Sequence, residues 1–175
     1  MEGGAVRNTR NAPMKKLTHL DAAGQAAMVD VSTKPVQLRE AVARGEIHLQ
    51  PATLALIEQN QIVKGNVLAT ARLAGIMAAK KTGELIPLCH PLPITHCEVK
   101  FETPGSRDRI VIIASAKIAA QTGVEMEALT AVTVAALTIY DMCKAVDKQM
   151  RITDVVLVSK TKTSTPSRPD AKARR

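Results

Sequence analysis

The chain has 175 residues and a formal net charge of +8, and its aromatic residues are one Phe and one Tyr, with no Trp. This length suits one domain with a sizeable core, and so few aromatic rings argue against modules that stack exposed nucleic-acid bases. The charge is confined to the ends: residues 1–16 carry +3, residues 160–175 carry +5, and residues 17–159 are formally neutral. The folded part therefore lacks the basic footprint of a nucleic-acid-binding protein.

Composition divides the chain into three segments. Residues 1–16 are predicted to be a disordered basic tail, residues 17–160 a single domain, and residues 161–175 a mobile basic tail. No run approaches the roughly eighteen apolar residues of a membrane span, and the N-terminus lacks the apolar stretch of a signal peptide. Three cysteines without a framework spacing suit free thiols in a reducing compartment. These features predict a cytoplasmic protein that does not enter a membrane.

The first third of the domain predicts one strand and two short helices. Ala27–Ser32 is predicted as the first strand. Pro35 is expected to open a helix that runs to about Ala43 and ends with Gly45 at its C′ position. A second short helix is expected to begin at Pro51.

A longer helix and a hairpin follow. Asn66 is a suitable cap for a helix over Val67–Thr82, which Gly83 would close. The pattern of residues 94–103 alternates with period two, and Arg109–Ala120 is rich in Ile and Val, so the two segments predict an antiparallel hairpin. The apolar face of its first strand consists of Cys97, Val99 and Phe101.

The longest apolar segment predicts a buried helix from Gly123 to about Val146. Thr122 and Glu125 have the spacing of a capping box at its start. A last strand is predicted over Ile152–Ser159. The order of elements predicts an α+β fold with a ferredoxin-like βαββαβ core, a mainly antiparallel sheet packed against helices, and additional N-terminal helices.

Charged residues at both ends of this long helix raise a geometric question. Glu127 and Asp141 are about 40° apart around the helix axis but about 21 Å apart along it. Asp141 and Lys144 share one face and can pair. The residues alone favour a solvated acid at one end and a surface ion pair at the other. A functional role for both ends would require more than one small pocket within one chain.

Two other positions can carry chemistry. Lys64 lies just before the Asn66 cap and is either a phosphate ligand or a solvated loop lysine. His90 follows Cys89 in a loop between Pro87 and Pro91, which restrict the backbone. A rigidly held imidazole suits a general acid or base, or a hydrogen bond to an oxyanion.

The pair Cys89-His90 also forms the pattern C-H-x5-H-C with His96-Cys97, which raises zinc as an alternative. Adjacent Cys-His pairs differ from the usual ligand spacings of zinc sites. His96 and Cys97 also face opposite sides of the predicted strand. The sequence therefore disfavours a metal site here.

Six separated motifs carry a resemblance to a known family. They are Met28-Val-Asp-Val-Ser32, Lys64-Gly65, Ala69-Thr-Ala-Arg-Leu-Ala-Gly-Ile76 with Ala78-Ala-Lys80, Leu85-Ile-Pro-Leu-Cys-His-Pro-Leu92, Thr122-Gly-Val-Glu-Met-Glu-Ala-Leu129 and Ala135-Ala-Leu-Thr-Ile-Tyr-Asp-Met-Cys-Lys-Ala-Val146. Over roughly residues 17–160 the chain resembles cyclic pyranopterin monophosphate synthase, the C-protein family of molybdenum cofactor biosynthesis.

The resemblance implies a catalytic domain with a ferredoxin-like fold in a hexamer, a trimer of dimers with sites at subunit interfaces. The implied activity is that of a phosphorus-oxygen lyase. It converts the nucleotide derivative 3′,8-cyclo-7,8-dihydro-GTP into cyclic pyranopterin monophosphate and releases pyrophosphate. The family needs no redox cofactor, and the resemblance implies neither a cofactor nor a metal site.

The resemblance also implies the site residues. Asp141 and Lys144 are expected to be the central proton-transfer pair, with Lys64 and His90 as further catalytic residues. The residues expected to bind substrate are Leu88, Cys89, His90, Glu125, Met126, Glu127 and Lys160. The chain departs from the family after Lys160, where Thr-Lys-Thr-Ser-Thr-Pro replaces a glycine-rich segment. A non-catalytic nucleotide-binding or scaffold protein, with basic tails that recruit a partner, remains the alternative.

Overall fold

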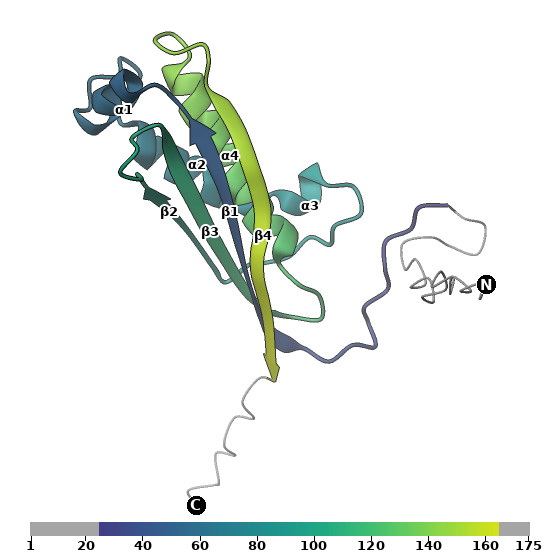
Figure 1. The fold of residues 1–175 in the computed structure, drawn as a ribbon. Helices are drawn as coiled ribbons and strands as arrows, with labels where there is room; N and C mark the ends of the chain where they lie inside the picture. Colours follow the sequence, from purple (N-terminus) through teal and green to yellow (C-terminus); the bar gives the residue numbers. More distant parts are fainter. Residues whose placement is uncertain (1–24, 165–175) are drawn as a thin grey trace, which may run out of the picture.

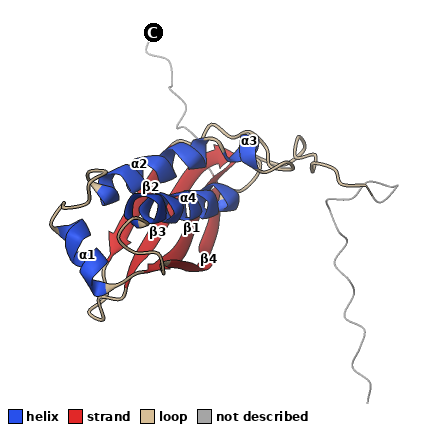
Figure 2. Cartoon of the chain, turned by 90° about the horizontal axis from the view of Figure 1, so that it is seen from above, coloured by secondary structure: helices blue, strands red, loops and turns tan. Residues whose placement is uncertain are grey.

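A computed structural model describes residues 25–164 and shows a four-stranded antiparallel sheet with its two long helices on one face (Figure 1, Figure 2). The strands are β1 Gln37–His48, β2 His96–Glu102, β3 Arg109–Ala120 and β4 Arg151–Ser164, and the helices are α1 Pro51–Glu58, α2 Val67–Lys80, α3 Thr82–Leu85 and α4 Glu125–Cys143. The strand order β2-β3-β1-β4 confirms the predicted ferredoxin-like core. Of the two long helices, α4 packs against all four strands and α2 against β2 and α4.

The helix predicted from Pro35 to about Ala43 is wrong, because this segment belongs to β1. Gln37–His48 pairs along its length with β3 on one side and with β4 on the other. Arg, Glu and Ala favour helices intrinsically. Here β1 lies between β3 and β4 and pairs with both, so tertiary pairing overrides the local preference. The predicted additional N-terminal helices therefore reduce to α1, which begins at Pro51 as expected.

Small residues on β1 have a packing role. Ala41 and Ala43 are buried on the face of the sheet that the helices cover. A β-carbon added at Gly45 would lie 2.6 Å from Cγ1 of Val132 in α4 and 3.1 Å from Cγ2 of Val155 in β4. Gly45 therefore does not end a helix, as predicted, but lets α4 approach the sheet closely.

The strand predicted over Ala27–Ser32 is also wrong. Within the described residues this segment is irregular, and its backbone bonds to side chains rather than to a neighbouring strand. The Val29 carbonyl lies 2.9 Å from Nε2 of His90, and the Ser32 carbonyl accepts from Nε2 of Gln121 at 3.0 Å. The segment is thus attached to the loops at one end of the sheet.

The predicted cap of α2 is confirmed, since Oδ1 of Asn66 accepts from the Ala69 amide at 2.9 Å. The helix ends at Lys80, so Gly83 lies inside the short helix α3 rather than at the predicted C′ position of α2. At Gly75, an added β-carbon would lie 2.8 Å from the Ala131 carbonyl oxygen of α4. This glycine therefore permits close packing of α2 on α4.

By length and composition alone, α4 passes as a membrane span, and it is the only such helix among the described residues. The sequence-based view that no segment approaches one therefore understated its apolar character. Half of its most apolar stretch is buried within the protein. Residues such as Ala128, Val132 and Ile139 are buried in the core between the sheet and α2. A core helix of this kind needs apolar residues around most of its circumference.

The hairpin is confirmed: β3 has the predicted bounds, and the alternation along β2 places Val99 in the core and Lys100 in solvent. The last strand is also present, but β4 extends to Ser164, so residues 161–164 of the predicted tail belong to the sheet. The tails predicted over residues 1–16 and beyond residue 164 lie outside the described residues.

Candidate functional site

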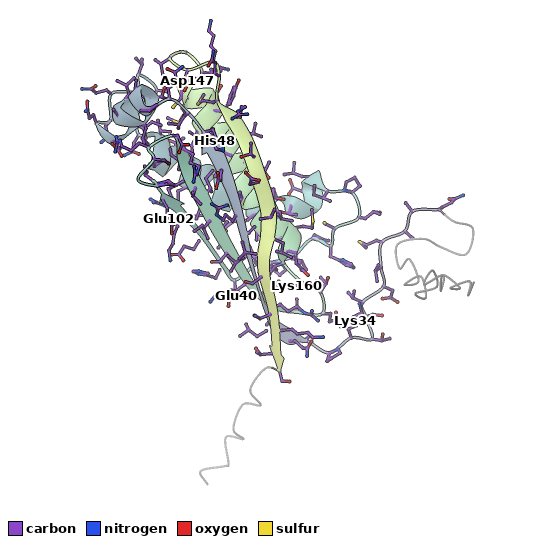
Figure 3. The ribbon with its side chains drawn as sticks, viewed as in Figure 1. Lys34, Glu40, His48, Glu102, Asp147 and Lys160 are labelled. Atoms are coloured by element: carbon purple, nitrogen blue, oxygen red, sulfur yellow. The ribbon has the colours of Figure 1, made fainter. Side chains whose placement is uncertain are left out.

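The charged side chains of α4 and its neighbours form two groups at opposite ends of the sheet. One group surrounds Asp141 near the C-terminal end of α4, and the other surrounds Glu125 and Glu127 at its N-terminal end. Figure 3 labels Asp147 near the first end and Lys160 near the second. The spacing predicted from the sequence is therefore real: one chain carries two separate groups.

At the C-terminal end, Asp141 binds two lysines. Its Oδ1 lies 2.8 Å from Nζ of Lys144, and its Oδ2 lies 2.7 Å from Nζ of Lys64. The Lys64 ammonium also donates to the Asp141 carbonyl at 3.0 Å. The predicted Asp141–Lys144 pair is confirmed as a contact, and the structure adds Lys64, which is 77 residues away in sequence.

These contacts shift pKa values within the triad Lys64–Asp141–Lys144. Hydrogen bonds from Lys144 and then Lys64 lower the pKa of Asp141 to about 2. The hydrogen bond to Asp141 in turn raises the pKa of Lys144. At neutral pH the triad therefore consists of one carboxylate between two ammonium groups. All three side chains are about half exposed, so an approaching anion can reach them.

At the N-terminal end of α4 lies a cavity of about 380 Å³. Three segments far apart in sequence enclose it: the N-terminal segment around Val29, the loop that carries His90, and the first turn of α4. Its lining residues include the predicted substrate-binding residues Leu88, Cys89, His90, Glu125, Met126 and Glu127. Sequence reasoning thus found two of the three walls.

Glu127 is the least exposed carboxylate of this cavity, at 3% relative exposure. Burial, which disfavours the charged form, is the main cause that raises its pKa, and the neighbouring Glu125 adds to the effect. Burial also raises the pKa of the Cys89 thiol, with a contribution from Glu127. The cavity therefore holds a carboxyl group that can take up and release protons closer to neutrality than a solvated glutamate.

The loop that carries His90 is held from two sides. The side chain contacts the Val29 carbonyl through Nε2, which fixes the ring against the N-terminal segment. A β-carbon at Gly83 would lie 2.9 Å from Cα of Pro91. Because Gly83 has no side chain, the loop can pack closely against α3. The imidazole thus contacts the N-terminal segment, and its loop packs closely on α3.

The predicted capping box at the start of α4 is wrong. The N-cap position is Val124, no side chain caps the helix, and the helix begins at Glu125. The Glu125 carboxylate instead lies 3.1 Å from Nζ of Lys160 in β4. Because β4 brings this lysine across, Glu125 makes an ion pair in place of the backbone hydrogen bond that the local sequence suggests.

Lys160 itself lines a second cavity of about 240 Å³, which shares Gly123 and Glu125 with the first. Lys34 lines the first cavity, and sequence reasoning missed it along with Val29 and Val31. The one available signal was the position of Lys34, two residues after the Met28–Ser32 motif. The strand assigned to that motif directed attention away from a cavity wall.

The two Cys-His pairs do not come together. Cys89 and His90 line the first cavity, whereas His96 and Cys97 line a different one beside Ile76. The zinc alternative therefore has no common centre in the described part of the chain.

Elsewhere, Glu46, His48 and Asp154 bring possible metal-ligand atoms within 4.8 Å of one another. The Glu46 carboxylate already pairs with Arg44, Arg109 and His48. A cation would have to displace the Arg44 and Arg109 guanidinium groups, so the group does not fit a metal site well.

The fold and these two groups define a ferredoxin-like α+β protein with clusters of charged side chains at both ends of its core helix. The sequence profile of the MoaC family matches residues 28–163. Relatives named cyclic pyranopterin monophosphate synthase include one from Chloroflexus aurantiacus, 60% identical over 83% of this chain and 89% of its own length, and one from Parvibaculum lavamentivorans, 58% identical over 84% and 92%. Cyclic pyranopterin monophosphate synthase 3 of Mycobacterium tuberculosis is 60% identical over 83% of this chain and 81% of its own length. The chain belongs to the MoaC family.

Proposed function

We propose that this protein is a cyclic pyranopterin monophosphate synthase in molybdenum cofactor biosynthesis. It converts 3′,8-cyclo-7,8-dihydro-GTP into cyclic pyranopterin monophosphate and releases pyrophosphate, which makes it a phosphorus-oxygen lyase. The observation that carries the proposal is the 60% identity, over 145 residues, to a relative that bears this name. The matched region contains both charged groups described above.

The chemistry of the reaction matches the groups available. Rebuilding a purine into a pterin requires proton transfers at nitrogen and carbon, which acids and bases of different pKa supply. Asp141 and Lys144 are proposed as the central proton-transfer pair, since the carboxylate holds the ammonium in place at 2.8 Å. Glu127, with its raised pKa, is proposed as a second proton-transfer group.

The phosphate chemistry requires positive charge. A ribose hydroxyl attacks the α-phosphorus and expels pyrophosphate, so cations near the transferring and leaving groups stabilise the transition state. Lys64 and Lys160 are proposed as phosphate ligands, and His90 as a substrate or relay group. The first cavity, about 380 Å³, falls within the range of roughly 300–1,000 Å³ typical of small-molecule sites.

The separation of the two groups supports an assembled site. About 21 Å of helix separates Glu127 from Asp141, more than one small pocket spans. We propose that one active site combines the cavity of one chain with the triad Lys64–Asp141–Lys144 of another, within a cytoplasmic hexamer arranged as a trimer of dimers. The exposure of the triad is consistent with a surface that a second subunit covers.

A direct assay tests the proposal. The purified full chain, incubated with 3′,8-cyclo-7,8-dihydro-GTP and no redox cofactor, is expected to release one pyrophosphate for each pterin formed. Pyrophosphate is measured by a coupled phosphatase assay and the pterin by chromatography. A folded protein that binds the nucleotide but releases no pyrophosphate would instead support the non-catalytic binding protein.

A further inference from the structure

Asp147 is a buried acid that the proposed chemistry does not use. It lies in the turn between α4 and β4 with 1% relative exposure, and Figure 3 labels it at the end of the sheet where α4 ends. Its carboxyl oxygens accept from three uncharged donors, the Gln50 amide at 2.8 Å, the Thr53 hydroxyl at 3.1 Å and the Gln149 amide at 3.0 Å. Burying an acid costs free energy, which these hydrogen bonds offset.

The side chain of Asp147 caps a helix that has no cap of its own. α1 begins at Pro51, and the side chain of its N-cap residue, Gln50, makes no capping hydrogen bond. Oδ2 of Asp147 accepts instead from the Gln50 amide and from the Thr53 hydroxyl in the first turn of α1. An acidic group is also favoured there by the helix dipole. Because α1 makes few contacts with the other helices and strands, this buried cap is one of the links that fix its first turn.

The main chain of Asp147 is bonded to the end of α4. Its amide and the amide of Val146 donate to the Cys143 carbonyl, at 3.0 and 2.9 Å. The Lys144 amide donates to the Tyr140 carbonyl at 2.9 Å, so it continues the bonding of the helix. Lys144 of the triad therefore lies in the same hydrogen-bonded turn as Asp147.

Lys64 belongs to the segment that follows α1. The Gly65 amide donates to the Ile62 carbonyl at 2.9 Å and closes the turn around Lys64. Figure 1 shows α1 and the end of α4 at the same end of the sheet. Burial is the main cause that raises the pKa of the Cys143 thiol to about 11, Asp147 adds to the rise, and Lys64 opposes it. Both charged side chains therefore lie near the same buried thiol.

We propose that Asp147 is a positioning residue that holds Lys64 against Asp141 and so fixes the geometry of the triad. This inference rests on the proposed function and adds one residue to it. The side chain of Asp147 holds α1 and the turn after it, while its main chain continues from the helix end that carries Asp141 and Lys144. Asp147 does not touch the substrate in this role, but acts through the 2.7 Å contact between Lys64 and Asp141. Displacement of a proton-transfer group lowers the rate, so loss of the link should lower kcat.

Two substitutions of the buried Thr53 separate the hydrogen bond from packing. Thr53→Val keeps the volume but removes the bond to Asp147, whereas Thr53→Ser keeps the hydroxyl and loses a methyl group. In the full-length protein, Thr53→Val should lower kcat for the cyclised nucleotide about tenfold and leave KM within about twofold, while Thr53→Ser stays close to wild type. A role in packing alone predicts the reverse order, because the lost methyl group leaves a cavity. The reverse order, or three equal kcat values, would overturn the proposal.

Far-UV circular dichroism at the assay temperature checks that each variant is folded. If Thr53→Val does not fold, Asp147→Asn replaces it, because this change keeps the volume of the side chain and one acceptor oxygen. It should lower kcat in the same way and leave KM within about twofold.

Acetylation of Lys64 gives a readout that does not depend on turnover. Mass spectrometry at low extent of reaction measures its acetylation rate relative to that of Lys100, an exposed lysine of β2. A loosened triad frees the Lys64 ammonium, so Thr53→Val should raise this relative rate about threefold, the scale of one exposed ion pair. A lower kcat with an unchanged Lys64 rate would overturn the proposal, since the triad would then be intact.

The two readouts separate this inference from the proposed function. If the wild type is active but Thr53→Val changes neither kcat nor the Lys64 rate, the positioning role is wrong and the proposed function stands. If the wild type is inactive but Lys64 reacts faster in Thr53→Val, the positioning of the triad stands and the proposed function is wrong.

Discussion

The two ends of α4 treat similar acidic side chains in opposite ways. At one end, Asp141 is half exposed, lies between two ammonium groups and has a pKa lowered to about 2. At the other, Glu127 is buried in a cavity wall and has a raised pKa. Neighbouring charge controls the first carboxyl group and desolvation controls the second. One helix thereby carries a carboxyl group with a lowered pKa at one end and a carboxyl group with a raised pKa at the other.

Neither end by itself contains all the residues that the resemblance implies for the site. The cavity has walls and a titratable acid, but Lys64 and Lys144, which are expected to be catalytic, lie at the other end of the helix. The triad has the charges but stands open to solvent. Together the two ends contain every residue that the resemblance implies. This supports a site built from two chains, and each experiment below tests one part of it.

The largest effect is expected at the triad. Lys144→Ala should lower turnover by roughly 10²–10⁴-fold, the usual contribution of a positioned acid or base. The protein should still fold, because this side chain is 56% exposed and belongs to a surface ion pair. Turnover and far-UV circular dichroism check the two statements. Lys148→Ala, an exposed lysine nearby, is the control and should keep wild-type turnover. A fully active Lys144→Ala protein would remove this residue from the mechanism.

Mixing two inactive variants tests whether the ends belong to one site. Glu127→Gln and Lys144→Ala proteins should each be weakly active alone. After dissociation and reassembly in equal amounts, random pairing of chains should restore about a quarter of wild-type activity, since half of the pairs carry one intact shared site. Turnover before and after reassembly measures this. If the mixture is no more active than its components, although exchange of labelled chains is verified, the shared site is excluded.

The opposite pKa shifts predict opposite stability profiles. Glu127 has a raised folded-state pKa, so its contribution to stability is full below pH 4.5 and is lost as pH rises through the folded pKa. Glu127→Gln should therefore stabilise the fold at pH 7 by on the order of 1 kcal/mol, the scale of burying a polar group, and the gain should shrink towards pH 4.

Asp141→Asn is the matched comparison, because the pKa of Asp141 is lowered. Its contribution to stability is present above pH 3.8 and is lost as pH falls towards 2. This variant should be less stable than the wild type at pH 7, with the difference vanishing at the acid end. Urea unfolding at several pH values measures both variants. If Glu127→Gln and Asp141→Asn changed the free energy of unfolding at pH 7 in the same direction, the proposed difference between the two ends would be contradicted.

The last prediction concerns the packing of α2 on α4, which joins the two elements that carry the triad. Gly75→Ala should destabilise the protein by about 1–3 kcal/mol, since the new β-carbon would lie 2.8 Å from the Ala131 carbonyl oxygen and force α2 away from α4. Lys64 precedes α2, so its contact with Asp141 should loosen too. Gly105→Ala, with no atom within 4 Å of the new β-carbon, is the control and should be neutral. Thermal unfolding of both variants decides whether the close approach matters.

Sequence reasoning succeeded where local chemistry and tertiary structure agree. The Asn66 cap, the bounds of β3 and the alternation along β2 were all predicted correctly. It failed at β1, where Arg, Glu and Ala suggest a helix but strands on both sides impose an extended backbone. It also failed at Glu125, because no local pattern reveals that Lys160 arrives from β4 to replace the expected cap.

The sequence by itself determined the element order, the core helix with charged ends, the family resemblance and the roughly 21 Å that separate Glu127 from Asp141, because these depend on residue type and helical rise. Only the tertiary structure decided that Lys64 binds Asp141 and that the segment around Val29 closes a cavity over His90. It alone attached the start of α1 to Asp147. Those contacts join residues far apart in the chain, and strand pairing and helix packing, rather than any local pattern, bring them together.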